Sequence, residues 1–141
     1  MSLRHLTLVG LLVSAFAVFP AAAADNGYFP RNPYDTRFCA GLETAFRTGN
    51  GTRLDCTSKT NAIVVEYFDY WPEAIGQALA LATKTGLQPG IVLVCRNDRQ
   101  HCTAAAHDVE SVFAGLKAPL TLWTCAVTDA SLGDCDKAVL P

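Results

Sequence analysis

Residues 62 to 95 read AIVVEYFDYWPEAIGQALALATKTGLQPGIVLVC, and this stretch decides the fold. Its first part, Ala62 to Phe68, is rich in β-branched and aromatic residues and predicts a strand. A helix is predicted next, because apolar residues recur at helical spacing, namely Ile75, Ala78, Leu79 and Ala82. Asp69 can cap this helix, Pro72 is tolerated in its first turn, and Gly86 supplies a left-handed terminus. A turn at Pro89 and Gly90 then leads into the apolar run from Ile91 to Cys95, which is typical of a buried strand.

A second strand–helix–strand unit follows directly. A helix is predicted from about Thr103 to Leu116, with Val109, Val112, Phe113 and Leu116 on one face. Pro119 stops it, and Leu120 to Val127 forms the last predicted strand. The connection from the strand at 91–95 must be a right-handed parallel crossover.

The residues before the deciding stretch predict a helix and the first strand of a hairpin. Asp35 or Thr36 can cap a helix whose apolar positions are Phe38, Leu42, Ala45 and Phe46, and Gly49 to Gly51 end it. A strand from Thr52 to Cys56 then pairs with 62–68 across a polar turn at 57–61. The predicted fold class is α/β (α+β): a three-layer sandwich with a mixed central sheet. Residues 25–34 are expected to be an extended arm and 128–141 a loop-like tail, with one domain between them.

The N-terminus is typical of a secretory signal peptide. Arg4 precedes an apolar run from Leu6 to Phe19, which is followed by Pro20 and four alanines ending at Ala24. The run is shorter than the roughly 20 residues that cross a bilayer, so cleavage after Ala24 is favoured over an uncleaved membrane anchor. The mature chain would hold 117 of the 141 residues, without a membrane span, and would be periplasmic or secreted.

The charge and the cysteines narrow the function classes. Without Arg4 the chain carries ten Lys and Arg against thirteen Asp and Glu, so tight non-specific binding to nucleic acid is disfavoured. Six cysteines in an oxidising compartment predict three disulfides, of which 39–56, 95–102 and 125–135 are the simplest of the fifteen pairings. A zinc site is the alternative, but the chain has no Cys-x-x-Cys pair, and His101, Cys102 and His107 lack a matching second pair.

The segments 53–56 and 62–77 resemble small proteins with the PD-(D/E)XK restriction-endonuclease-like fold. Those relatives have an Asp at the end of the first hairpin strand, a second strand that reads roughly Ala-Ile-Glu-Val-Asp-Phe, and then Lys-Trp and Glu-Ala-Ile-Gly-Gln. Asp55 matches the strand-end acid, Glu66 the second-strand Asp and Gln77 the helix glutamine, while Trp71 and 73–77 match the helix start. The resemblance implies a restriction-endonuclease-like sandwich and a metal-dependent nuclease site.

In such nucleases, acids on adjacent strand ends hold Mg²⁺ or Mn²⁺, and a lysine stabilises charge or activates water. The resemblance makes Asp55 and Glu66 the metal ligands, with Glu43 as the extra acid that some members use. Two positions depart from the pattern: Val64 replaces the strand glutamate and Tyr70 replaces the lysine. Valine cannot ligate a metal, and Lys59 on the hairpin turn is the remaining candidate cation.

Each candidate also has a purely structural interpretation. Asp55 can bond turn N–H groups, Glu66 can be a solvent-facing strand residue, and Gln77 and Glu43 can be ordinary helix residues. The aromatic residues Tyr67, Phe68 and Trp71 fit a core or, if exposed, a binding face.

Three functions stay open at this point. The first is a non-catalytic exported protein that binds a partner, such as another protein, through a nuclease-like scaffold. The second is an active secreted nuclease that uses Asp55 and Glu66 with Lys59 or Glu43. The third is a thiol or stress protein of the cell envelope, although the chain lacks Cys-x-x-Cys.

Overall fold

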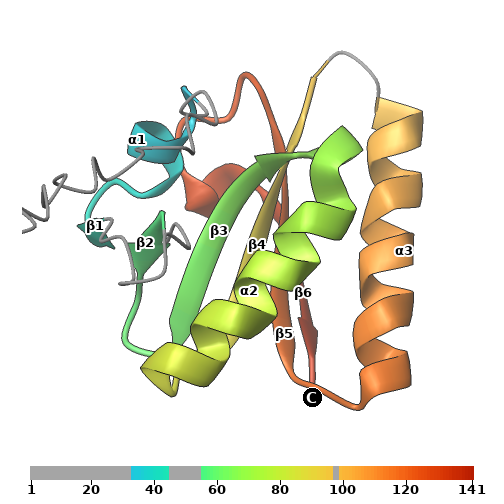
Figure 1. Cartoon of the computed structure of the whole chain (residues 1–141). Coiled ribbons are helices and arrows are strands. Elements are labelled where there is room, and N and C mark those ends of the chain that lie inside the picture. The colour runs from blue at the N-terminus through green and yellow to red at the C-terminus, as the bar shows by residue number, and fades with distance from the viewer. Residues whose placement is uncertain (1–32, 45–54, 97–98) are drawn as a thin grey trace, which may run out of the picture.

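The computed structural model describes residues 33–44, 55–96 and 99–141 (Figure 1). The predicted signal peptide and most of the predicted arm lie outside these residues, as does the segment 45–54. The elements in chain order are α1 (Asp35–Phe38), β1 (Glu43–Thr44), β2 (Cys56–Thr57), β3 (Asn61–Tyr67), the 3-10 helix η1 (Phe68–Tyr70), α2 (Trp71–Thr85), β4 (Gln88–Cys95), α3 (Arg99–Leu116), β5 (Leu120–Ala126), the 3-10 helix η2 (Leu132–Asp134) and β6 (Asp136–Leu140).

The sheet is mixed, as predicted, and its strands follow chain order from β1 to β6. The central strands β3, β4 and β5 are parallel, while the pairs β1–β2, β2–β3 and β5–β6 are antiparallel. The predicted crossover is therefore confirmed as β4–α3–β5, and the preceding strand, helix and strand form a second one, β3–α2–β4. The predicted hairpin is also present, with Cys56 opposite Ile63.

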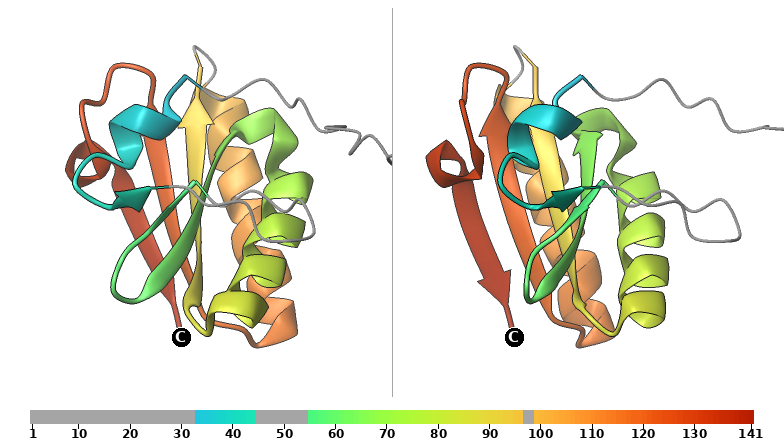
Figure 2. Two further views of the ribbon diagram at one scale, coloured as in Figure 1. Left: turned by 60° about the vertical axis from the view of Figure 1, so that its left-hand side comes forward. Right: turned by 90° about the vertical axis from the view of Figure 1, so that its left-hand side faces the viewer.

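Both long helices lie on the same face of the sheet (Figures 1 and 2). The two crossovers step across the sheet in the same direction, and right-handed connections then place both helices on one side. The other face is covered in the described residues by the N-terminal segment with α1 and by the segment after β5 that contains η2, not by a layer of long helices. The predicted third layer is thus reduced to two short helices, α1 and η2.

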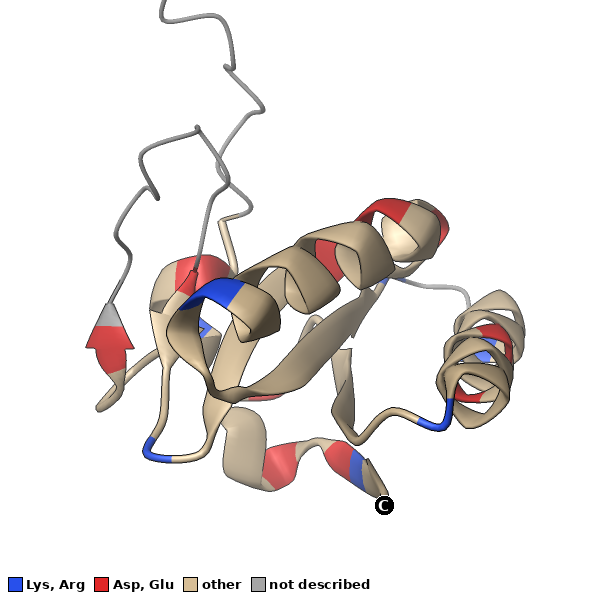
Figure 3. Cartoon of the chain, turned by 60° about the horizontal axis from the view of Figure 1, so that its bottom comes forward, with Lys and Arg blue, Asp and Glu red and all other residues tan. Residues whose placement is uncertain are grey.

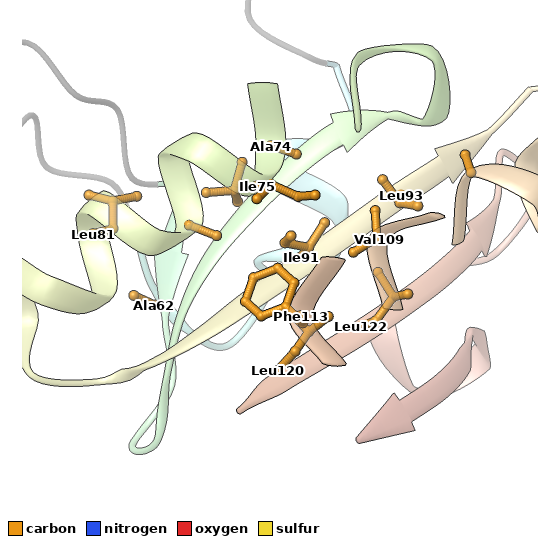
Figure 4. Close-up of a cluster of buried hydrophobic side chains, with 13 residues drawn as sticks. Ala62, Ala74, Ile75, Leu81, Ile91, Leu93, Val109, Phe113, Leu120 and Leu122 are labelled. Atoms are coloured by element: carbon orange, nitrogen blue, oxygen red, sulfur yellow. The ribbon is translucent and has the colours of Figure 1, made fainter. Parts of the chain in front are cut away.

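The helix-bearing face holds the larger part of the core. Side chains of β3, β4 and β5 meet those of α2 and α3, and Phe113 lies among Ile91, Leu120 and Leu122 (Figure 4). A second cluster lies on the opposite face, consisting of Phe38, Cys39, Cys56, Ile63, Val65, Val92, Val94, Trp123 and Cys125. Because the central strands are buried on both faces, they read as continuous apolar runs.

The first helix is shorter than predicted. α1 ends at Phe38, Gly41 has a positive φ of 78°, and the chain continues into β1, so Leu42 and Glu43 are not helical. The Cys39–Cys56 disulfide also joins the end of α1 to β2. Helical spacing alone was misleading here, and the remaining predicted positions, Ala45 and Phe46, lie outside the described residues.

Other predicted element boundaries also needed correction. Pro89 and Gly90 belong to β4 instead of a turn, and α3 begins at Arg99 instead of Thr103. Asp69 does not cap α2, since it lies within η1. Gly86 does end α2 with φ 71°, as predicted.

The C-terminal tail was predicted as a loop, and this prediction is wrong. Residues Asp136–Leu140 form β6, which pairs antiparallel with β5 so that Trp123 lies opposite Lys137. The Cys125–Cys135 disulfide holds the chain just before β6 against β5. All three predicted pairings are present, 39–56, 95–102 and 125–135, and none of the six cysteines is free.

Candidate functional site

Asp55 extends the pairing between β2 and β3. Its side chain is buried, and its Oδ2 accepts a hydrogen bond of 2.7 Å from the N–H of Val65. Its own N–H donates to the Ile63 carbonyl at 3.2 Å. The carboxylate therefore stands where a backbone carbonyl would continue the ladder, which is a structural role for the predicted catalytic acid.

Val64 and Glu66 lie on the same face of β3, the one that α2 and α3 cover. The hairpin register, continued by one residue, sets Asp55 beside Val64, so Asp55 and Glu66 occupy diagonal positions along this strip. Val64 is completely buried in the core beneath α2. Glu66 is half-buried, and its Oε1 accepts a 3.0 Å hydrogen bond from the N–H of Tyr67.

Tyr70 and Gln77 follow this strip on the next elements. Tyr70, at the position of the expected lysine, ends η1 and is 50% exposed. Gln77 lies in α2, half-buried. These two positions thus carry a phenol and an amide, and neither group supplies a positive charge.

Lys59 and Glu43 lie apart from the end of β3 that carries Glu66. Lys59 is exposed on the turn that precedes β3, which is held by hydrogen bonds from the N–H groups of Thr60 and Asn61 to Ser58 Oγ. Glu66 lies five positions after Asn61 in the strand, a rise of roughly 16 Å at 3.3 Å per residue. Glu43 is exposed in β1 opposite Thr57, not on a helix. The five predicted residues therefore do not form a single cluster.

Potential metal ligands meet at one other place. In residues 33–44, 55–96 and 99–141, the only group of three His, Cys, Asp or Glu ligand atoms within 4.8 Å of one another is Cys125, Asp129 and Cys135. The two sulfurs of this group are bonded to each other. Cys102 is likewise in a disulfide, and His107 Nδ1 lies 3.5 Å from Glu110, so the zinc alternative gains no set of ligands.

The structure also brings together a set of residues that the sequence did not group. Arg96, Tyr67, Tyr34 and Arg37 form what we call the arginine–tyrosine row. The Cζ atom of Arg96 lies 3.8 Å from the ring centroid of Tyr67, and the Tyr67 ring meets that of Tyr34 edge-on at 6.0 Å and 84°. At the other end, the Cζ atom of Arg37 lies 5.0 Å from the Tyr34 centroid.

The row lies at the carboxyl ends of the parallel strands. Tyr67 is the last residue of β3 and Arg96 follows the last residue of β4, while Arg37 Nη1 donates to the carbonyls of Val127 and Asp129 beyond β5, at 2.6 and 3.3 Å. The two predicted strand ends are a usable signal for Tyr67 and Arg96, whereas Tyr34 falls in the segment predicted as an extended arm.

The other two candidate aromatics have a different environment. Phe68 and Trp71 are partly buried against the core on the helix-bearing face, whereas Tyr67 packs against the cluster on the opposite face. The three neighbours along the chain therefore do not form a single binding face.

A polar hollow of about 310 Å³ lies near the same edge, on the helix-bearing side. Its lining residues are Cys95, Arg99, Thr103, Thr124, Ala126, Asp129, Asp134 and Asp136. Asp129 accepts a hydrogen bond from the Ala126 N–H, and Asp134 accepts one from the Ser131 N–H. Two of its three acids therefore already stabilise the local backbone.

The described part of the chain contains no helix that is long and apolar enough to span a membrane. Its Lys and Arg residues are spread over separate elements without gathering on one surface (Figure 3). Comparison with protein-family models, curated proteins and solved structures finds no match for this chain.

Proposed function

We propose that this chain is an exported, non-catalytic binding protein on a nuclease-like scaffold. The observation that carries the proposal is Val64, whose fully buried side chain occupies the strand position beside Asp55 where the resembling nucleases have a glutamate. A valine has no atom that can ligate a metal. The paired strands therefore lack one of the acids that would hold the metal ion.

The contacts of the two remaining acids support the same conclusion. Asp55 accepts the Val65 N–H, and Glu66 accepts the Tyr67 N–H. Both bonds stabilise the end of β3. Tyr70, in place of the expected lysine, cannot supply a cation, because a phenol is either neutral or negatively charged.

The cysteines support work outside the reducing cytoplasm. All six are paired, and disulfides persist in oxidising compartments such as the periplasm or the extracellular space. The disulfides hold the scaffold together, and its surface is available to bind a partner. We expect that partner to be a protein.

A cleavage assay tests the proposal. The oxidised protein is incubated with plasmid and with single-stranded DNA, in Mg²⁺ or Mn²⁺ and with a chelator as control. We expect no cleavage in any of these conditions. Metal-dependent cleavage by the wild type that Asp55→Asn abolishes and the exposed-site control Glu73→Gln retains would overturn the proposal.

An active nuclease is the second candidate, favoured by the diagonal positions of Asp55 and Glu66 on one face of the hairpin. It would use Mg²⁺ or Mn²⁺, and calorimetric titration of either ion into the protein should then give saturable heat that Asp55→Asn removes. A thiol or stress protein of the envelope ranks third, because all six cysteines are in disulfides.

A further inference from the structure

The arginine–tyrosine row holds one guanidinium group over a ring, on an exposed side chain. Arg96 is exposed, and its Cζ lies 3.8 Å from the centroid of Tyr67. A guanidinium stacked in this way keeps its N–H donors in the plane of the group, directed away from the ring. The ring also restricts the long side chain, so less conformational entropy is lost when the donors bind.

Packing beneath the row fixes the two rings. Tyr34 stacks on Phe38, whose side chain is buried, with ring centroids 6.1 Å apart. Tyr67 is part of the same cluster on the α1 side of the sheet, and the Cys39–Cys56 disulfide ties that segment to β2. The row is thus a surface feature on a cross-linked support.

The two arginines have different roles. Arg37 donates to two backbone carbonyls and so connects α1 to the end of β5. Within the described residues, the side-chain contact of Arg96 is the one with the Tyr67 ring. Its donors are therefore the part of the row that suits an incoming acceptor.

A carboxylate matches this arrangement better than a nucleic-acid backbone. Planar oxygen pairs bind guanidinium groups in bidentate fashion, and Tyr and Arg are the residues enriched where proteins bind one another. A nucleic-acid partner gains affinity by neutralising many phosphates, whereas the row has two cations in a protein of net negative charge.

We infer that the arginine–tyrosine row is the docking site for an acidic segment of a partner protein, with Arg96 as the residue that binds its carboxylate. This inference rests on the proposed binding role and specifies its partner. Tyr67 acts through Arg96, as a positioning residue.

Fluorescence anisotropy with a labelled poly-glutamate peptide tests the inference, with poly-lysine and single-stranded oligothymidine as parallel probes. We expect the oxidised protein to bind poly-glutamate in preference to both. Arg96→Gln should weaken binding about tenfold, which is typical of a residue that dominates an interface. Arg96→Lys keeps the charge without the planar fork, and Tyr67→Leu keeps the charge without the ring, so both should weaken binding as well.

Arg99→Gln is the matched control. It removes the same charge from another exposed arginine close along the chain that has no ring contact in the described structure, and binding should change less than about twofold. Equal losses in Arg96→Gln and Arg99→Gln, no binding of poly-glutamate, or tighter binding of oligothymidine would each overturn the inference. A wild type that cuts DNA but binds poly-glutamate through Arg96 would contradict only the absence of catalysis; one that does neither would contradict only the docking site.

Discussion

At the scale of single residues, Asp55 has a structural role that its predicted catalytic role did not include. Its buried carboxylate accepts the Val65 N–H at 2.7 Å. Asp55→Ala leaves that N–H without this acceptor in a buried position, so we expect the free energy of unfolding to fall by about 1–3 kcal/mol. Urea denaturation measures the change. Glu43→Ala, at an exposed position of β1, should stay within about 0.5 kcal/mol of the wild type.

Two glycines provide a matched pair for packing. A Cβ atom added at Gly90 in β4 would lie 3.1 Å from Ile63 Cγ1 and 3.3 Å from Trp123 Cζ3, while one at Gly76 in α2 would meet nothing within 4 Å. Gly90→Ala should therefore destabilise the fold by about 1–3 kcal/mol. Gly76→Ala should stabilise it by up to about 1 kcal/mol, because alanine favours the helix. Thermal melting of both variants measures these changes in stability. A Gly90→Ala variant that is more stable than the wild type would contradict this account of the β3–β4 contact.

At the scale of elements, β6 depends on a cross-link beside it. It is a five-residue edge strand held on one side by β5, and the Cys125–Cys135 disulfide fixes its start. In a variant with both cysteines changed to alanine, we expect the amides of β6 to exchange with solvent faster than in the wild type. Hydrogen-exchange mass spectrometry measures this.

The corresponding variant of Cys39 and Cys56, at the opposite edge of the sheet, serves as the control. It should leave the exchange of β6 unchanged. Equal protection of β6 in the wild type and in the Cys125 and Cys135 variant would show that β5 pairing alone holds the strand.

The elements that the sequence predicts are those with a strong local pattern. β3, α2, β4 and β5 have apolar runs or stripes that report burial directly, and they were found with small boundary errors at Pro89 and Asp69. The tail residues 136–140 mix charged and apolar side chains, because an edge strand is only half-buried. No pattern within these residues predicts that they pair with β5. The first helix fails for the converse reason: its spacing is helical, but Gly41 and the disulfide at Cys39 end it early.

At the scale of the whole molecule, the disulfides should decide whether the fold is stable. Each disulfide raises the free energy of unfolding by about 2–4 kcal/mol, mainly because it restricts the unfolded chain. A domain of this size has a net free energy of unfolding of about 5–15 kcal/mol. We expect no reactive thiols in the unfolded, unreduced protein and six after reduction, with loss of cooperative melting. Free thiols before reduction, or unchanged melting after it, would contradict this expectation.

Export is tested on the same scale. Expression with the natural N-terminus in a secreting bacterial host should yield a periplasmic or extracellular product that begins at Asp25, as read from its intact mass. Retention of residues 1–24 in a membrane fraction would favour the uncleaved anchor instead.

The overall arrangement was only partly predictable. The parallel crossover after the strand at 91–95 follows from the sequence, but the direction of both crossovers across the sheet, and hence the common face of α2 and α3, depends on strand order. The arginine–tyrosine row depends on the same order, because Tyr34, Tyr67 and Arg96 meet only after three distant segments are placed side by side.

Each disulfide joins two cysteines that are consecutive along the chain: the first with the second, the third with the fourth, and the fifth with the sixth. A polypeptide that crosses a membrane N-terminus first presents its thiols in this order. An oxidant that joins each pair as it emerges would thus produce the native set, one of fifteen, without reshuffling. Maturation of this protein should therefore tolerate a host that lacks a disulfide isomerase, provided that the host can still oxidise newly exported chains.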